Sequence, residues 1–242
     1  MPDKTSRRIA WEAARLLRAG SEKDWQQARI KATRRLVRGR LPSDRLPGED
    51  SIRDALLALC GEAPRGPDAS GRSPDPERRS RLRQFESWLR PLETIRMPRE
   101  SHPEGDALYH SLQVFELVRD EAPYDEELLI AGLLHEVGRA EDRDDPIAAT
   151  VAMLGDRVTE RTRWLITHHA AIVTQFDGSI SARKRRGFRR HPWYEDLVTL
   201  ADADRDGRQV GVAVPDEREA LRYIDSLAAF DADDPAEAPF DG

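Results

Sequence analysis

The chain has 242 residues, of which 38% are hydrophobic and 35% are charged, and its formal net charge at pH 7 is −6. The charged share is well above the roughly 25% of an average globular protein, so we expect heavily charged outer faces around a real core. The longest uncharged apolar run, Leu128 to Leu134, is far shorter than the roughly 20 residues of a membrane helix, so we expect no membrane-spanning segment.

The first helical patterns lie before residue 61 and predict a small helical N-terminal module over residues 1–60. Its helices are expected at residues 6–18, 22–38 and 52–60. The apolar stretch of the first helix carries Glu12 and Arg15, so it lacks the uninterrupted core of a secretory signal. The single cysteine, Cys60, cannot form an internal disulfide and is expected to be a buried structural thiol. We therefore expect a cytoplasmic protein.

Residues 61–76 are rich in glycine and proline with almost nothing to bury, which predicts a linker. A larger helical domain is then expected over residues 77–230, followed by an acidic disordered tail at 231–242. The helices of the larger domain are expected at residues 77–96, 106–120, 125–138, 146–156, 160–173, 180–190, 194–203 and 216–229. Strand-like alternation is confined to the short run from Val210 to Val214, so we predict an all-α fold. Gly138 is expected to stop its helix.

Charge is unevenly distributed along the chain. Residues 1–100 hold 23 Lys and Arg against 15 Asp and Glu, whereas residues 101–242 hold 16 against 30. Within the acidic part, six cations fall in the eight residues from Arg183 to Arg190. This run can hold the phosphates of a nucleotide or a nucleic-acid backbone, or it can be a solvated helix face paired with acids. Arg185, Arg186 and Arg189 are the substrate-binding candidates.

Five of the six histidines fall within residues 102–169, and three of the segments that carry them have strongly apolar helical faces. Since an unpaired buried imidazole costs roughly 1 to 3 kcal/mol, several such histidines on separate helices suggest a shared metal ion. His135 and Glu136 can reach one ion near a helix end, and His110 can add a second imidazole. An acid from the segment 200–208 can complete the set. Such mixed ligation suits Mn, Fe, Zn or Mg rather than a sulfur-bound metal.

In their order along the chain, these histidines and acids resemble the pattern of the HD-domain metal-dependent phosphohydrolases, which is a histidine, a His-Asp doublet and a distal aspartate. The resemblance covers about residues 80–210. It is carried by His110, by His135-Glu136 within Leu-Leu-His-Glu-Val-Gly-Arg, by His168-His169 and by Ala203-Asp204-Arg205. The segment from His102 to His110 also resembles the HD domain attached to bacterial tRNA nucleotidyltransferases. The fold that this implies is an HD-domain helical bundle preceded by the N-terminal module.

The resemblance also implies the roles of particular residues. The metal ligands would be His110, His135, Glu136 and Asp204, with His135, Glu136 and Asp204 as the catalytic residues. His168, His169 and Arg139 match positions that hold a second metal or a phosphate. Asp202 competes with Asp204 for the distal place, and Asp204 is preferred because it stands in the Ala-Asp-Arg pattern. The implied cofactor is a divalent metal: Mn, Fe, Zn, Ni or Mg.

One departure from the family pattern concerns Glu136, because the family has aspartate there. The extra methylene requires the ion or the backbone to shift by about 1 Å, which predicts altered metal binding. Arg139 stands where the family has lysine. It keeps the positive charge and can bind a phosphate through two parallel hydrogen bonds.

The implied activity is hydrolysis of a phosphate ester of a nucleotide or related small molecule by a metal-activated water. Two alternatives stay open: a non-catalytic HD-fold module that binds RNA, nucleotide or a protein partner, and an accessory to RNA end-processing. Outside the motif, we expect His102 to be a loop or capping residue, Asp106 a helix N-cap and His191 a structural residue.

Overall fold

The computed structural model describes residues 4–37, 41–42, 45–60, 75–173 and 182–228, and all regular structure in these ranges is helical. The predicted all-α fold is therefore confirmed. The Val210–Val214 run is irregular rather than a strand, and the one β-bridge joins Arg96 to Asp106. The chain divides into two compact units, residues 1–73 with 228–242, and residues 74–227. The predicted tail and nearly all of the predicted linker lie outside the described residues.

The first unit is a three-helix cluster in which α1 packs against both other helices. Its helices are α1 (Lys4–Arg18), α2 (Trp25–Leu36) and α3 (Glu49–Cys60). Small and branched side chains such as Ile9, Ala28 and Ile52 are fully or almost fully buried between them. Because alanines supply much of this core, the helices can approach closely.

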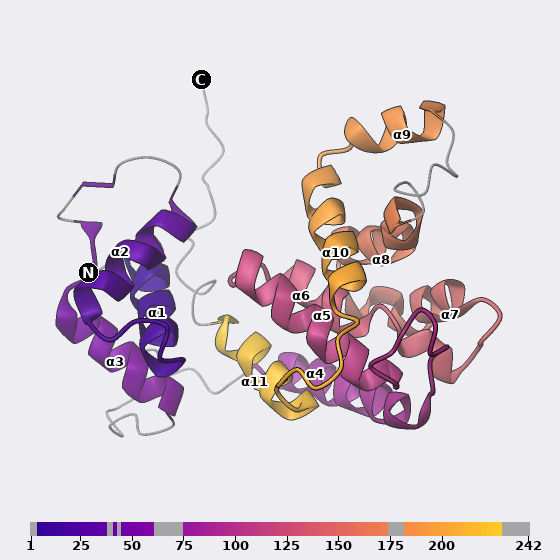
Figure 1. Cartoon of the computed structure of the whole chain (residues 1–242), viewed down its shortest axis with the longest axis horizontal. Coiled ribbons are helices and arrows are strands. Elements are labelled where there is room, and N and C mark those ends of the chain that lie inside the picture. The colour runs from indigo at the N-terminus through magenta and orange to yellow at the C-terminus, as the bar shows by residue number, and fades with distance from the viewer. Residues whose placement is uncertain (1–3, 38–40, 43–44, 61–74, 174–181, 229–242) are drawn as a thin grey trace. The chain divides into compact units, whose positions relative to one another are not determined.

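The second unit is built around α6 (Glu126–Leu134), all of whose residues from Leu128 onward are buried. Helices α5, α8 and α10 pack against it and α10 also contacts α5 and α8, as Figure 1 shows at the centre of this unit. The other α-helices of the unit are α4 (Pro76–Leu89), α5 (Ala107–Glu121), α7 (Pro146–Leu154), α8 (Glu160–Val173), α9 (Ala182–Arg189), α10 (Tyr194–Asp206) and α11 (Glu217–Ser226). Short 3-10 turns lie at Arg90–Thr94, Val137–Ala140 and Gly155–Arg157. None of the described helices has the length and apolar character needed to cross a bilayer.

Hydrogen bonds join helices α6, α8 and α10 near the start of α6. Arg161 of α8 donates hydrogen bonds to Asp125 and Glu127 at 2.7 and 2.8 Å, and to Asp196 of α10 at 3.2 Å. These bonds and charges raise the pKa of Arg161 against the opposing effect of burial. Because several hydrogen bonds share one planar guanidinium, the helix ends are held in a fixed relative position.

The prediction that the helix runs to Gly138 is wrong. Helix α6 ends at Leu134, and a 3-10 turn follows. Gly138 has a steric role instead, because a Cβ there would lie 2.2 Å from the carbonyl oxygen of Pro146 and 2.3 Å from the amide nitrogen of Thr150. The backbone after His135 therefore lies directly against the first turn of α7.

Candidate metal site

Four buried histidines form a continuous chain of edge-to-face rings in the second unit. The ring centroids of His102 and His110 lie 5.1 Å apart, those of His110 and His135 5.3 Å, and those of His135 and His169 5.2 Å. They come from the loop before α5, from α5, from the end of α6 and from α8. Segments that are far apart in sequence thus bring their imidazoles to one place.

The Nδ1 atom of each ring is already engaged at the periphery. Three of them face backbone carbonyl oxygens, which only accept, so in these three rings Nδ1 carries a hydrogen and donates it. The pairs are His110 with Gly207 at 3.0 Å, His135 with Gly132 at 2.8 Å and His169 with Ile166 at 2.7 Å. The Nδ1 of His102 lies 2.9 Å from the hydroxyl of Ser101. Metal-binding histidines are commonly held in this way, which leaves Nε2 as the ligand atom.

The Nε2 atom of His110 lies 3.0 Å from Oδ1 of Asp204 and 3.3 Å from Nε2 of His135. Around an ion with bonds of about 2.1 Å, neighbouring ligand atoms at right angles are about 3.0 Å apart and opposite ones about 4.2 Å apart. His110 therefore has the spacing of an adjacent ligand from both Asp204 and His135, and all three ligand atoms lie within 4.8 Å of one another. Oε1 of Glu136 lies 4.0 Å from Nε2 of His135, which matches an opposite position.

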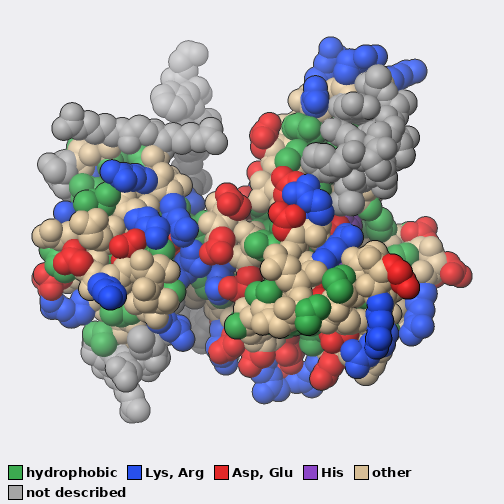
Figure 2. Space-filling view, viewed as in Figure 1, with side chains coloured by type: hydrophobic (Ala, Val, Ile, Leu, Met, Phe, Trp, Pro, Cys, Tyr) green, Lys and Arg blue, Asp and Glu red, His purple; other side chains and the backbone are tan. Residues whose placement is uncertain are grey.

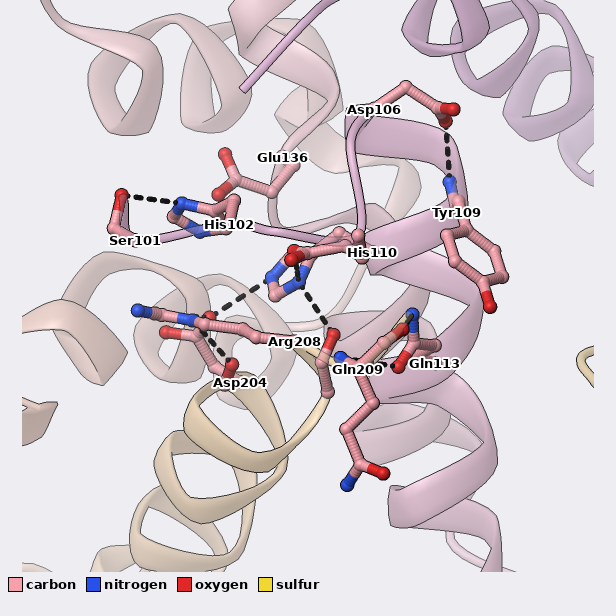
Figure 3. Close-up of polar contacts among 12 residues, drawn as sticks. Ser101, His102, Asp106, Tyr109, His110, Gln113, Glu136, Asp204, Arg208 and Gln209 are labelled. Carbon is pink, nitrogen blue, oxygen red and sulfur yellow. Dashed lines mark hydrogen bonds and ion pairs between the residues drawn. The ribbon is translucent and has the colours of Figure 1, made fainter. Parts of the chain in front are cut away.

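A second, overlapping group consists of His102, His110 and Glu136, whose ligand atoms all lie within 4.8 Å of one another. Figure 3 shows His102, Glu136 and Asp204 placed around the ring of His110. His102 lies in a loop, as predicted, but the residue is buried, at 8% exposure, within this group, which the sequence did not predict. The sequence signal was its position eight residues before His110, but loop conformation decides where such a side chain points.

Glu104 is a further buried acid that the sequence did not single out. Both of its carboxylate oxygens are buried and neither accepts a hydrogen bond of good geometry, although Oε1 lies 3.0 Å from Nδ1 of His110. Burial alone would raise the pKa of this carboxyl, and the interaction with His110 more than offsets it. Glu104 thus adds negative charge behind the His110 ring.

The His110 and Asp204 pair is strongly polarised. Burial would lower the pKa of His110, but the contacts with Asp204 and Glu104 outweigh it and raise the value to about 9. Burial would likewise raise the pKa of Asp204, and its bond to His110 and the nearby imidazoles hold it well below its usual range. Without an ion, the site at neutral pH therefore contains a protonated His110 that compensates the charge of Asp204.

His135 has the opposite character, because burial lowers its pKa to about 4, with further lowering from His169 and His110. It is a neutral imidazole at physiological pH, the form that binds metals. Burial would raise the pKa of Glu136, but the effect is outweighed by His135 and by hydrogen bonds from Arg139. Glu136 is therefore ionised.

Two guanidiniums border the site, each bonded to one of its acids. Arg139 donates to both carboxylate oxygens of Glu136, and Arg208 donates to Oδ1 of Asp204 at 3.1 Å. Their side chains are 27% and 24% exposed, so both groups reach from the buried cluster to solvent. Arg139 was predicted from the sequence, whereas Arg208 was not.

The remaining predicted residues lie apart from the two groups. The ring of His168 lies against Trp164 with centroids 4.7 Å apart, whereas the ring of its neighbour His169 lies against His135. Asp202, the competing distal acid, forms an ion pair with Arg205 and is 41% exposed. Asp106 caps α5 by accepting from the amide of Tyr109, as predicted.

Helix α9 carries the predicted basic run on a surface rather than in the histidine cluster. Figure 2 shows blue side chains gathered over it. Phe188 is buried and its ring lies 5.5 Å from that of His168. Arg186 and Arg189 are exposed, and the side chain of Arg185 lies outside the described residues. His191 stacks on Trp164 with centroids 3.8 Å apart, in agreement with a structural role.

A scan of the chain against protein-family models and a search of curated proteins give no match.

Proposed function

We propose that this chain is a metal-dependent phosphohydrolase of the HD type that hydrolyses a phosphate ester of a nucleotide or related small molecule. The observation that carries the proposal is the convergence of His110, His135 and Asp204: Nε2 of His110 lies 3.0 Å from Asp204 and 3.3 Å from His135, and the three ligand atoms all lie within 4.8 Å of one another. The sequence resemblance supplies the reaction class. The geometry supports the proposal because these residues come from three different helices or helix ends. Hydrogen bonds from Nδ1 to backbone carbonyl oxygens fix the orientation of both imidazoles.

The donor set fits a divalent ion of the first transition row. Two or more imidazoles with two carboxylates favour Mn, Fe, Ni or Zn, whereas Mg prefers oxygen ligands alone. His110, His135, Asp204 and Glu136 would hold the ion, which lowers the pKa of water and polarises a phosphoryl oxygen when it is bound. Binding the ion requires His110 to release the proton that it shares with Asp204.

The chain's own residues would position the substrate. Arg139 and Arg208 present donors at the edge of the site, where each is partly exposed, and guanidiniums bind phosphoryl oxygens through two parallel hydrogen bonds. Because each arginine is bonded to an acid of the site, its guanidinium lies beside the ion position. These two guanidiniums would stabilise negative charge that develops on the phosphoryl group. The Nδ1 of His169 donates to Ile166, which leaves its Nε2 lone pair as a ligand atom for a second ion, the other role that the resemblance implies.

The test uses protein stripped of metal with a chelator and then loaded with Mn, Fe, Ni or Zn. Each form is assayed on p-nitrophenyl phosphate, on bis-p-nitrophenyl phosphate and on a panel of nucleotides. We expect hydrolysis that needs added metal. The rate should fall at least 100-fold in His135→Ala, because this variant lacks one of the metal ligands. Metal-loaded wild-type protein that hydrolyses none of these esters would contradict the proposal.

A second candidate is a non-catalytic binding module for nucleotide or RNA. It is favoured by the bond between Arg139 and Glu136, since this carboxylate is already neutralised by a cation, and by the exposed cations of α9. Binding of RNA that weakens steeply with salt, without hydrolysis in any metal form, would select this candidate.

A further inference from the structure

We propose that His102 is a fifth protein ligand of the same ion, so that three imidazoles and two carboxylates surround it. This inference rests on the metal site proposed above and extends it by a residue that the resemblance does not assign. The five ligands would be His102, His110, His135, Glu136 and Asp204.

The first support is the position of His102. Its ligand atom lies within 4.8 Å of those of His110 and Glu136, and its buried ring meets the ring of His110 edge to face with centroids 5.1 Å apart.

The second support is the order of the loop that carries His102. The amide of Met97 donates to Gly105 at 2.9 Å, and the amide of His102 donates to Pro98 at 2.8 Å. Gly105 has φ +112°, a conformation that other residues rarely adopt, and it lets the chain turn into α5. The loop is therefore closed by its own backbone bonds and presents His102 inward without help from an ion.

The third support comes from the departure at Glu136. Its carboxylate belongs to the group with His102, whereas an aspartate would hold the carboxylate nearer its own backbone by about 1.5 Å, the length of one carbon–carbon bond. The longer acid therefore extends the ligand set toward the loop. A chain that pairs glutamate with this extra histidine can keep both on one ion.

A five-residue ligand set has a consequence for the identity of the metal. Zn²⁺ sites are mostly four-coordinate, whereas Mn²⁺ and Fe²⁺ accommodate six ligands of nitrogen and oxygen. We therefore expect the site to discriminate less in favour of Zn²⁺ over Mn²⁺ than a three- or four-ligand site does. Removal of His102 should shift the preference toward Zn²⁺.

The test counts imidazole ligands on the full chain. Pulsed electron paramagnetic resonance of the Mn²⁺-loaded wild-type protein should detect three coordinated imidazole nitrogens, and His102→Ala should detect two. Mn²⁺ affinity should fall at least tenfold in His102→Ala and change less than twofold in His191→Ala, a matched histidine that stacks on Trp164. The visible spectrum of the Co²⁺ form should change from a weak six-coordinate band toward a stronger one of lower coordination in His102→Ala.

The outcomes separate this inference from the proposed function. Two coordinated imidazoles in the wild-type protein, with unchanged Mn²⁺ affinity in His102→Ala, would overturn the role of His102 and leave the metal site intact. Failure of the wild-type protein to bind any divalent ion would overturn both. Because the nitrogen count is made on the wild-type protein, it holds even if the His102→Ala variant is unstable.

Discussion

Nε2 of His110 and Oδ1 of Asp204 lie 3.0 Å apart across 94 residues of sequence, and this contact joins α5 to α10 inside the second unit. His110 is fully buried and Asp204 is 6% exposed, so the pair is shielded from water on almost every side. A buried histidine and a buried acid at this distance stabilise each other as an ion pair, and both belong to a group of residues that could hold a metal ion.

Asp204→Asn should abolish tight metal binding while Asp202→Asn should not. The asparagine keeps the size of the side chain but lacks the charge that balances the ion, so we expect Mn²⁺ affinity to fall at least 100-fold. Asp202, two residues before Asp204 on the same helix, pairs with Arg205 at the surface. Isothermal titration of both variants measures the difference. Equal affinities in the two variants would mean that Asp204 is not a ligand.

Glu136→Asp should retain metal and increase turnover of a phosphate ester, because the shorter acid restores the doublet of the resembling family. It should also break the bidentate contact with Arg139. Glu136→Gln, in contrast, should lose at least tenfold in metal affinity, since the amide is a weaker ligand than a carboxylate. Kinetics at saturating metal compare the forms, and absence of turnover in both wild type and Glu136→Asp with every ion would favour the binding module.

The ion-free protein should lose stability as the pH rises above neutrality. The pKa of His110 is about 9 in the folded protein, against about 6.5 in an unfolded chain. The folded state therefore binds the extra proton between these values, so the stabilisation is fully present below pH 6.5 and is lost as the pH rises through 9. Linkage gives a slope of about 1.4 kcal/mol per pH unit within this window.

Urea unfolding with a chelator at pH 6.5, 7.5 and 8.5 measures this slope. His110→Gln, which has no titrating imidazole, provides the comparison and should show a flatter dependence. If the two proteins lose stability with the same slope, the His110 imidazole is not protonated in the folded, ion-free state.

Gly138→Ala should destabilise the second unit by about 3 kcal/mol, because its Cβ would collide with backbone atoms of α7 that cannot rotate away. Gly187→Ala is the control: nothing lies within 4 Å of its Cβ, and alanine should stabilise α9 by about 0.5 to 1 kcal/mol. Thermal unfolding of the two variants compares them. A Gly138→Ala protein as stable as the wild type would contradict the close packing of the turn after His135 on α7.

Much of the fold follows from local patterns in the sequence. Asp145 before Pro146 predicts the start of α7, and the carboxylate of Asp145 accepts from the amide of Ala148 there. The helix that contains Leu128 was predicted from apolar residues alone, but its end was not. The helix ends where Gly138 must pack against α7, and this contact with a later helix cannot be predicted from the local sequence pattern.

The candidate site likewise contains residues that a sequence motif predicts and residues that no motif predicts. The preference for Asp204 over Asp202 follows from a motif, and the structure places Asp204 in the histidine cluster and Asp202 at the surface. His102 and Glu104 lie in an irregular loop whose direction depends on backbone bonds around Gly105, so periodicity says nothing about them. Arg208 stands four residues after Asp204, a spacing that brings side chains together on a helix, but it lies beyond the end of α10 and was not predicted.

The most direct test of the account is the metal content, by elemental mass spectrometry, of the untagged protein and of its His135→Ala variant. Absence of a polyhistidine tag matters because a tag binds metal itself. We expect close to one equivalent of Mn, Fe, Ni or Zn in the wild-type protein and little in the variant. No metal in either protein, even after incubation with these ions, would contradict a metal-dependent function.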